Sequence, residues 1–316
     1  MKSNQDTTHF VAPLEETPLL ATDAVKTDHA PLSLWADAWK KLRRRPLFIV
    51  SAVMILVILV VAFFPGLFTQ TAPNDNCQLA NSDGAPSPGH PFGFTFQGCD
   101  VYARVIYGTQ ASVMVGVFAV IGVLLVGVTL GALAGFYGGW IDAVIARLGD
   151  IFFALPLVLG ALVVTQLPFF RENKSVWTVI MIIVLLAWPQ MARLTRGAVI
   201  EVRNADFITA ARSLGVSRIQ TLLRHVLPNA LAPIIVLATM ELGVFIVLEA
   251  TLSFLGIGLP GSIMSWGNDI SAAQSSIRTN PAVLLYPAAA LSITVLSFIM
   301  LGDALRDALD PKSRQR

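Results

Sequence analysis

Long apolar stretches separated by shorter polar segments make up most of this 316-residue chain. A helix needs roughly 20 predominantly apolar residues to cross the hydrocarbon core of a bilayer. Stretches of suitable length that are nearly free of charge predict six transmembrane helices, at residues 47–68, 110–136, 148–168, 176–194, 229–254 and 282–302. The expected fold class is therefore an all-α polytopic membrane protein.

Polar segments around these spans divide the rest of the chain. Residues 1–30 are polar and irregular, which predicts a disordered tail. Residues 31–46 are expected to form a helix at the membrane interface, because apolar residues line one side and cations the other. The apolar side holds Leu34, Trp35, Ala38, Trp39 and Leu42, and the other side holds Lys40, Lys41 and Arg43. Such a helix serves either to anchor the chain on the membrane surface or to dock onto a partner subunit.

Three further regions complete the predicted organisation. Residues 69–109 are expected to form a loop between the first two spans, residues 110–302 the core of the remaining spans, and residues 303–316 a C-terminal tail. Within the core, residues 195–228 form the longest polar interruption between apolar stretches. This interruption lies between the fourth and fifth spans.

Composition and charge support the membrane assignment and give it an orientation. Hydrophobic residues make up 55% of the chain and charged residues 13%, which is too apolar for a soluble domain of this length. Most of the 22 Lys and Arg residues fall in segments on one side of the predicted spans, leaving Arg104, Arg171, Lys174 and Arg278 on the other. Because cytoplasmic segments carry the excess of cations, both termini and the 195–228 loop are expected in the cytoplasm.

The loop after the fourth span has a helical pattern of its own. It is basic, with arginines at 193, 196, 203, 212, 218 and 224. Apolar residues recur at spacings of three and four on either side of Gly215, first at Phe207, Ala210, Ala211 and Leu214, then at Ile219, Leu222, Leu223 and Val226. The pattern predicts two short helices joined at Gly215, with Asp206 and Ser217 at their starts.

This loop resembles the EAA loop of the permease subunits of ATP-binding-cassette importers. Five residues fit that motif in register: Ala210, Ala211, Gly215, Leu227 and Pro228. Thr209 stands where Glu is usual, which removes a carboxylate from the motif. His225 stands where Ile is usual, and the run Arg224, His225, Leu227, Pro228, Asn229 resembles the dipeptide, oligopeptide and nickel branch of the family.

Other segments resemble the same branch. They are His90–Gly93 with Asp100 and Arg104–Gly108, Glu249–Gly258 with Ser265–Asn268, and Gly302–Pro311. The resemblance covers roughly residues 32 to 311, and the long N-terminal lead and the C-terminal ending are closest to the C-type permease of the branch.

The resemblance implies a type I ABC importer permease fold with cytoplasmic coupling helices, in the plasma membrane of a bacterium. Expected partners are a second permease subunit in a heterodimer, two ATPase subunits and an extracytoplasmic substrate-binding protein. No cofactor is expected on this chain, since ATP and Mg would bind to the ATPases. The residues expected to couple to the ATPases are Thr209, Ala210, Ala211, Arg212, Gly215, Arg218, Arg224, His225, Leu227 and Pro228. The expected cargo is a peptide, with nickel or another small solute as the alternative.

Missing motifs argue against other classes of function. The sequence has no phosphate-binding loop with its lysine, no zinc-protease motif and no hydrolase nucleophile elbow. Its four histidines are scattered at 9, 29, 90 and 225. An intramembrane enzyme, a metal site and a nucleic-acid partner are therefore not expected. An ion-coupled secondary transporter is a weaker alternative, because the halves of the chain show no clear internal repeat.

Two carboxylates lie inside a predicted span. Charged groups at membrane depth are costly and face protein or water. One or both of Glu241 and Glu249 are therefore expected to line a translocation cavity and to meet a cationic group of the cargo, such as a peptide ammonium. The alternative for each is a structural hydrogen bond to a neighbouring helix.

Two small motifs complete the prediction. Cys77 and Cys99 both fall in the 69–109 loop, where an oxidising compartment would join them; two free thiols are the alternative. Gly127, Gly131 and Gly135 have the four-residue spacing that lets helices pack closely in lipid. Close packing within the bundle is one interpretation of these glycines, and a sliding contact during transport is the other.

Overall fold

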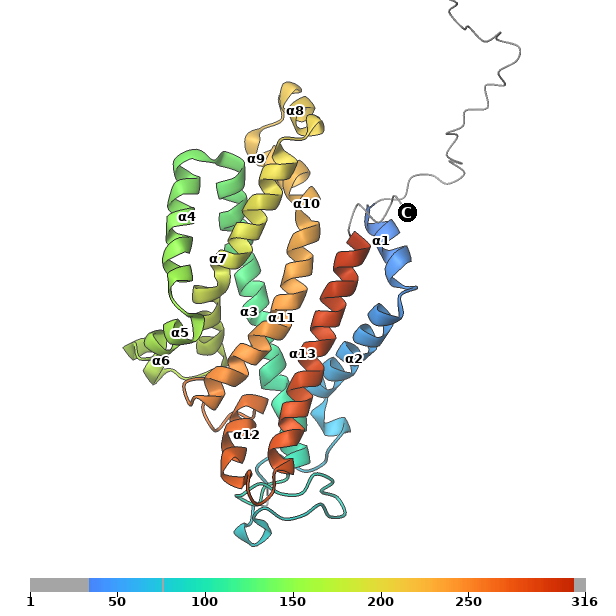
Figure 1. Cartoon of the computed structure of the whole chain (residues 1–316), viewed down its shortest axis with the longest axis vertical. Helices are drawn as coiled ribbons and strands as arrows, with labels where there is room; N and C mark the ends of the chain where they lie inside the picture. Colours follow the sequence, from blue (N-terminus) through green and yellow to red (C-terminus); the bar gives the residue numbers. More distant parts are fainter. Residues whose placement is uncertain (1–33, 76, 310–316) are drawn as a thin grey trace, which may run out of the picture.

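Long apolar helices form the body of the computed structural model, which describes residues 34–75 and 77–309 (Figure 1). Five helical stretches among these residues are long and apolar enough to cross a membrane, and a sharply bent pair of helices raises the number to six. The described residues contain no β-strand beyond two isolated bridges. The prediction of an all-α polytopic membrane protein is confirmed. The predicted tail at 1–30 and residues 310–316 lie outside the described residues.

The helices run in the order α1 (Leu34–Leu42), α2 (Pro46–Phe63), α3 (Val101–Tyr137), α4 (Gly139–Ala154), α5 (Leu157–Thr165), α6 (Pro168–Glu172), α7 (Val176–Arg203), α8 (Asp206–Ser213), α9 (Arg218–Thr221), α10 (Leu227–Asn229), α11 (Leu231–Phe254), α12 (Trp266–Ala272) and α13 (Ala282–Leu309). A π-helical turn, η3 (Leu222–Val226), separates α9 from α10. Short 3-10 turns are η1 (Pro65–Leu67), η2 (Leu79–Asn81) and η4 (Ala273–Ser276). In Figure 1, α8 and α9 lie at one end of the bundle, and α12 and the loop before α3 lie at the other.

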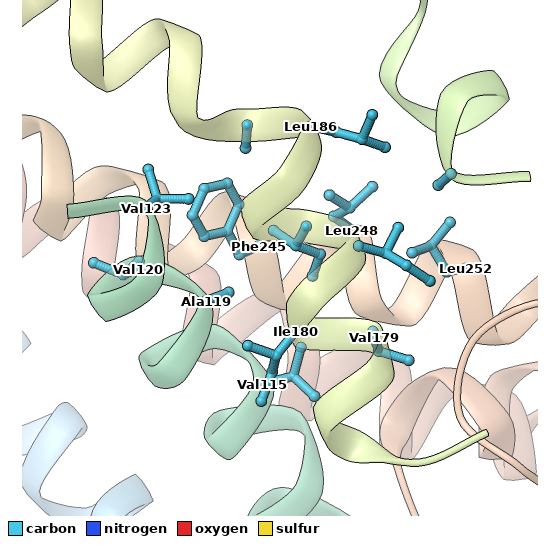
Figure 2. Packing of buried hydrophobic residues seen from close by; sticks show 14 of the residues in the cluster. Val115, Ala119, Val120, Val123, Val179, Ile180, Leu186, Phe245, Leu248 and Leu252 are labelled. Atoms are coloured by element: carbon cyan, nitrogen blue, oxygen red, sulfur yellow. The ribbon is translucent and has the colours of Figure 1, made fainter. Parts of the chain in front are cut away.

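The main hydrophobic core lies where α3, α7 and α11 meet (Figure 2). Val115 and Val123 of α3, Val179 of α7, and Phe245 and Leu252 of α11 are all buried there. Lipid is as apolar as these side chains, so the core forms by close packing rather than by removal of apolar surface from water.

Small residues make that close packing possible. Gly127, Gly131 and Gly135 form a line on α3 that faces α7. A Cβ atom added at Gly131 would overlap the carbonyl oxygen of Ala192 and lie 2.8 Å from the Cβ of Thr195. The backbones of α3 and α7 therefore approach more closely than any larger side chain would allow.

Helix α3 begins nearer to the N-terminus than the predicted span at 110. Asp100 caps it, because its carboxylate accepts a hydrogen bond from the backbone N–H of Tyr102 at 2.9 Å. The first turns contain Arg104, whose charge suggested a loop, but this side chain is paired within the protein. The predicted loop at 69–109 therefore ends at residue 100.

The predicted span at 148–168 is broken rather than continuous. Helices α4 and α5 meet at an angle of 88°. Leu155 adopts an extended conformation between them, as expected for a residue that precedes proline, and Pro156 has no N–H for the helical ladder. The sharp turn places two short helices where one straight span was predicted.

Two other spans are longer than predicted. Helix α7 continues from the predicted end at 194 to Arg203, and α13 continues from 302 to Leu309. The extension of α7 carries arginines whose partners lie on α3 and α4, so the charges that ended the predicted span are neutralised or hydrogen-bonded. Part of the predicted C-terminal tail is therefore helical.

The N-terminal helix α1 has a protein partner. Ala38 and Leu42, predicted to face the membrane, are buried against Ala304 and Ala308 of α13. Trp39, also on the apolar side, remains largely exposed and packs edge-on against Phe48. The apolar side of α1 thus packs partly on α13 and is partly exposed, rather than lying entirely on the membrane surface.

We predict that Gly131→Ala lowers the thermal stability of the purified protein in detergent. The added methyl group overpacks the α3–α7 contact, at a cost of about 1–3 kcal/mol. Gly197→Ala is the matched control, because Gly197 is also helical and a Cβ there meets nothing within 4 Å. The melting temperature of the control should stay equal or rise, and an equal loss in both variants would contradict the close-packing argument.

Candidate functional site

The segment between α7 and α11 is a structured turn of helices at one end of the bundle. After α8, Gly215 adopts a positive φ of 83°. Its N–H bonds to the carbonyl of Arg212, and the N–H of Val216 bonds to the carbonyl of Ala211. This pair of bonds is the Schellman ending of a helix, in which glycine avoids the steric cost of the left-handed conformation.

The second helix of the segment also has a defined start. The hydroxyl of Ser217 accepts a hydrogen bond from the N–H of Gln220, so Ser217 caps α9. Asp206 lies in the first turn of α8, where its negative charge interacts favourably with the helix dipole. The N-cap residue of α8 is Ala205. The two helices and their junction thus lie where the apolar pattern predicted them.

The inner face of this segment packs on the ends of α3 and α7. Ile208, Leu222 and Val226 are buried in a cluster with Phe136 and Val199. Sequence reasoning missed Ile208 and chose the face of Phe207 instead, because an eight-residue helix with apolar residues on two sides has no single periodic face. The cluster fixes the segment to the helical bundle.

The outer face combines exposed apolar side chains with cations that make no ion pair among the described residues. Leu214 is 85% exposed and Ile219 63% exposed, and Phe207 and Leu223 are exposed as well. The exposed arginines of this face are Arg212, Arg218 and Arg224. Large apolar side chains beside cations at the end of a membrane bundle form a surface suited to a protein with an acidic rim around an apolar groove. We call this set of seven residues the outer face of the α8–α9 segment.

The other three arginines of the predicted basic loop bind within the chain. Arg196 makes a bidentate pair with Asp142 of α4, with N–O distances of 2.5 and 2.7 Å. Arg193 pairs with Asp150 of α4 at 2.9 Å. Arg203 donates to the carbonyl of Gly135 at the end of α3 at 2.6 Å. These arginines hold helices together and are not available to a partner.

All residues predicted for coupling lie at this end of the bundle. Thr209, Ala210, Arg212, Gly215, Arg218, Arg224 and Pro228 are exposed, and Ala211, His225 and Leu227 are half-buried. His225 lies in the π-helical turn η3, and its carbonyl accepts a hydrogen bond from the side chain of Asn229 at 2.6 Å. Most of the motif residues are thus exposed. The half-buried His225 and Leu227 lie in η3 and α10, which connect α9 to α11.

A cavity of about 530 Å³ lies between the bend of α4 and α5, helix α7 and helix α11. Its walls are largely apolar, with Pro156 at the bend, and Gln190 and Glu241 add polar groups. Glu241 is only 4% exposed, and its Oε2 atom has no hydrogen-bond partner among the described residues. A carboxyl group with one oxygen unpaired among the described residues therefore borders this partly open cavity.

Glu249 does not line this cavity. It is fully buried, and its carboxylate accepts hydrogen bonds from the hydroxyls of Ser112 on α3, at 3.0 Å, and Ser253, at 2.8 Å. The expectation that Glu249 lines the cavity is wrong in this structure, and the alternative of a structural bond to a neighbouring helix describes it. The serine on α3 could not be paired with Glu249 from sequence, because 137 residues separate them.

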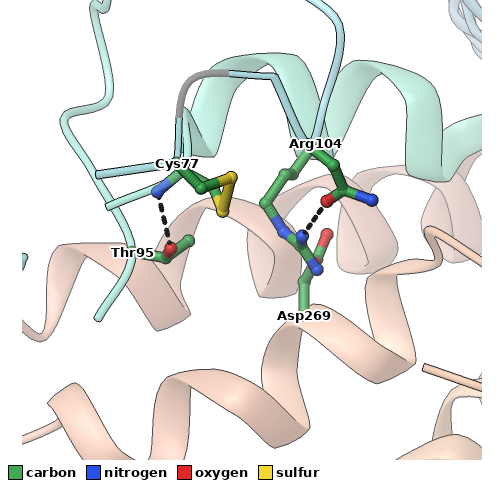
Figure 3. The surroundings of a disulfide bond; sticks show 6 residues. Cys77, Thr95, Arg104 and Asp269 are labelled. Atoms are coloured by element: carbon green, nitrogen blue, oxygen red, sulfur yellow. Dashed lines mark hydrogen bonds and ion pairs between the residues drawn. A yellow bond between two sulfur atoms is a disulfide. The ribbon is translucent and has the colours of Figure 1, made fainter. Parts of the chain in front are cut away.

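At the opposite end of the bundle, a disulfide and a buried ion pair hold the loop before α3 (Figure 3). Cys77 and Cys99 are bonded to each other. Arg104 pairs with Asp269 of α12 through two N–O distances of 2.8 and 2.6 Å, and also donates to the side chain of Asn74 at 2.9 Å. Arg104 thus joins α3, α12 and the loop.

Burial governs the electrostatics of this ion pair. Desolvation raises the pKa of the Asp269 carboxyl above its usual range, and the Arg104 guanidinium opposes that rise. The sequence offered a weak signal for the pair, since Arg104 is one of the few cations predicted on its side of the membrane. Its acidic partner is far along the chain and was not predicted.

An apolar multi-helix bundle with a structured basic segment at one end and a partly open apolar cavity is compatible with a membrane transport component. Comparison with known families agrees. Residues 127–315 match the family of binding-protein-dependent transport system inner membrane components, and residues 33–85 match the N-terminal transmembrane domain of oligopeptide transport permease C. The chain belongs to this family of inner-membrane transport components, and is a multi-pass membrane protein.

Individual relatives place the chain within the family. It is 36% identical to the dipeptide transport system permease protein DppC of Alkalihalophilus pseudofirmus, over 94% of this chain and 96% of the relative. It is also 36% identical to the oligopeptide transport system permease protein OppC of Bacillus subtilis, over 93% and 95%. A chain of the inward-facing MetNI methionine ABC transporter has the same fold, with a TM-score of 0.53 and 21% identity over 66% of this chain and 96% of that chain.

We predict that Arg104→Met strongly lowers thermal stability, because it leaves Asp269 buried without its partner. Removing one member of a buried pair costs about 3–5 kcal/mol. The control is Arg45→Met, which breaks the exposed Arg45–Asp307 pair at the α1 end and should cost at most about 1 kcal/mol. Melting temperatures in detergent give the comparison, and a similar small loss in both variants would contradict a structural role for the buried pair.

Proposed function

We propose that this chain is one permease subunit of an ATP-binding-cassette importer that carries peptides. Its expected partners are a second permease subunit that completes the pathway, two ATPase subunits and an extracytoplasmic substrate-binding protein. ATP and Mg would bind to the ATPases, and this chain would perform no catalysis. Peptide cargo is proposed over nickel or another small solute because the two relatives above are named for dipeptide and oligopeptide transport.

The outer face of the α8–α9 segment carries the proposal. It combines exposed Leu214 and Ile219 with three exposed arginines. Of these, Arg212 lies over the ring of Phe136, with its Cζ 5.2 Å from the ring centroid. The inner face, through Ile208 and Val226, is packed on the ends of α3 and α7. A partner that binds the outer face can therefore move α3 and α7 through a rigid contact, which is what coupling ATP closure to transport requires.

Several features support an orientation with this segment and both termini in the cytoplasm. Arg104 pairs with Asp269 of α12, and Lys174 bonds to the carbonyl of Gly256 in the loop before α12. Among the described residues, α1, the start of α4, the end of α7 and the α8–α9 segment hold many of the other cations, and Figure 1 shows these elements towards the α8 end. Excess cations on the α8 end fit the cytoplasmic side. The disulfide between Cys77 and Cys99, at the α12 end, fits an oxidising compartment on the other side of the plasma membrane of a bacterium.

Leu214 is the most exposed apolar residue of the outer face of the α8–α9 segment. Leu214→Ala should weaken binding of the ATPase subunits by tenfold or more, because burying a leucine side chain contributes about 1.5–3 kcal/mol. Leu79→Ala is the matched control, since Leu79 is similarly exposed at the other end of the bundle. Affinity can be measured by titrating purified ATPase into detergent-solubilised permease pairs. Equal affinity of both variants would remove the outer face as the docking surface.

The turn at Gly215 fixes the angle between α8 and α9. Gly215→Val should abolish the stimulation of ATP hydrolysis by the loaded binding protein in proteoliposomes that contain the full complex. A β-branched residue is strained at this positive φ, by about 1–3 kcal/mol, although the space around Gly215 is open.

Gly215→Asn separates backbone strain from loss of glycine itself. Asparagine tolerates the left-handed conformation, so this variant should retain most of the stimulation. Full coupling in Gly215→Val would argue that the fixed geometry of the turn is not needed, and equal failure of both variants would point to a cause other than φ.

A further inference from the structure

The cavity between α4, α5, α7 and α11 holds one ionisable side chain. Among the residues that line it, Glu241 alone carries a titratable group, and Gln190 and Thr251 add neutral polar groups. The hydroxyl of Thr251 is already bonded to the carbonyl of Val247. The polar character of the cavity is therefore set by Glu241 and Gln190.

Glu241 differs from the second carboxylate on the same helix. Glu249 accepts two serine hydroxyls and needs no further partner. Glu241 is almost as deeply buried, yet its Oε2 atom has no partner among the described residues. Burying a carboxyl group without a hydrogen bond is costly. Because Glu241 lines the cavity, a donor that enters the cavity and reaches this carboxyl group would offset that cost.

The cavity suits an organic cation better than a bare metal ion. Metal ions need several oxygen ligands, and no group of three or more possible acidic, histidine or cysteine ligands occurs among the described residues. A volume of about 530 Å³ is within the range of small-molecule sites. Phe152 and Phe245 line the same space with aromatic rings, which attract ammonium groups. Phe153 also lines it, but its ring already faces the guanidinium of Arg193 at 3.9 Å.

We propose that Glu241 binds the ammonium group of a peptide as it passes through the cavity. The amide oxygen of Gln190 offers a second acceptor in the same space, and the apolar walls contact the uncharged part of the cargo. The assignment rests on the proposed function, because it takes a peptide as the cargo. A single carboxylate in an otherwise apolar cavity gives a weak site, which permits release as the pathway opens.

The test uses a reporter cysteine in the cavity of the full complex, reconstituted in proteoliposomes. Val244→Cys is suitable because Val244 lines the cavity, is exposed, and lies three residues from Glu241 on α11. The two native cysteines are bonded to each other and do not react. The probes are aminoethyl methanethiosulfonate, which is cationic, and sulfonatoethyl methanethiosulfonate, which is anionic.

The cationic reagent should react with the reporter faster, relative to the anionic reagent, when Glu241 is present. Adding Glu241→Gln should lower this ratio by about tenfold, because a nearby unit charge is removed at constant shape. Adding Glu249→Gln is the matched control and should leave the ratio unchanged, since Glu249 lies outside the cavity. Val247→Cys, which also lines the cavity, provides a second reporter if the first variant is poorly folded.

Peptide protection then identifies the ligand. Trialanine should slow modification of the reporter, N-acetyl-trialanine should not, and Glu241→Gln should remove the protection. Equal reagent ratios with and without Glu241, or equal protection by both peptides, would overturn the ammonium site. Failure of the proposed function would look different: the complex would take up no trialanine with ATP, whereas the reagent ratio would still report on Glu241.

Discussion

The close approach of α3 and α7 is the constraint on which the rest of this structure depends. Gly131 and its neighbours at positions four residues away remove the side chains that would hold the two backbones apart. Because the pair is rigid, α11 packs against both helices and completes the core. The ends of the same two helices also pack against Ile208 and Val226. One contact in the apolar interior thus orders the cavity and positions the α8–α9 segment.

Charged groups in this protein divide by whether the chain itself satisfies them. Arg196 and Arg104 have acidic partners on other helices, and each ion pair connects two helices. Glu249 has two serine donors and serves the same purpose at membrane depth. Glu241 and the arginines of the outer face have no such partners in the described part of the chain. Groups of this second kind are the ones through which the proposed partners and cargo would act.

Apolar patterns in the sequence were sufficient to predict the order and approximate positions of the spans, the two short helices and the turn at Gly215, because these depend on neighbours a few residues apart. They could not predict the bend between α4 and α5. Pro156 breaks its span, whereas Pro189 and Pro287 lie inside the continuous helices α7 and α13. Whether a proline ends a helix depends on the surrounding helices. The role of Glu249 likewise depends on Ser112, which lies 137 residues away in the sequence.

The bend at Pro156 also places backbone carbonyl groups beside the cavity. The last turn of α4 ends there, and the final carbonyl groups of a helix have no donors within it. At membrane depth such groups need water or protein, and Phe152 to Leu155 border the cavity. The carbonyl of Phe152 accepts the N–H of Leu155 at 3.3 Å, so the carbonyls that follow it in the chain are the ones left at the bend. A peptide passing the bend can donate its own N–H groups to these carbonyls, so the backbone as well as the side chains would contribute polar groups to the proposed pathway.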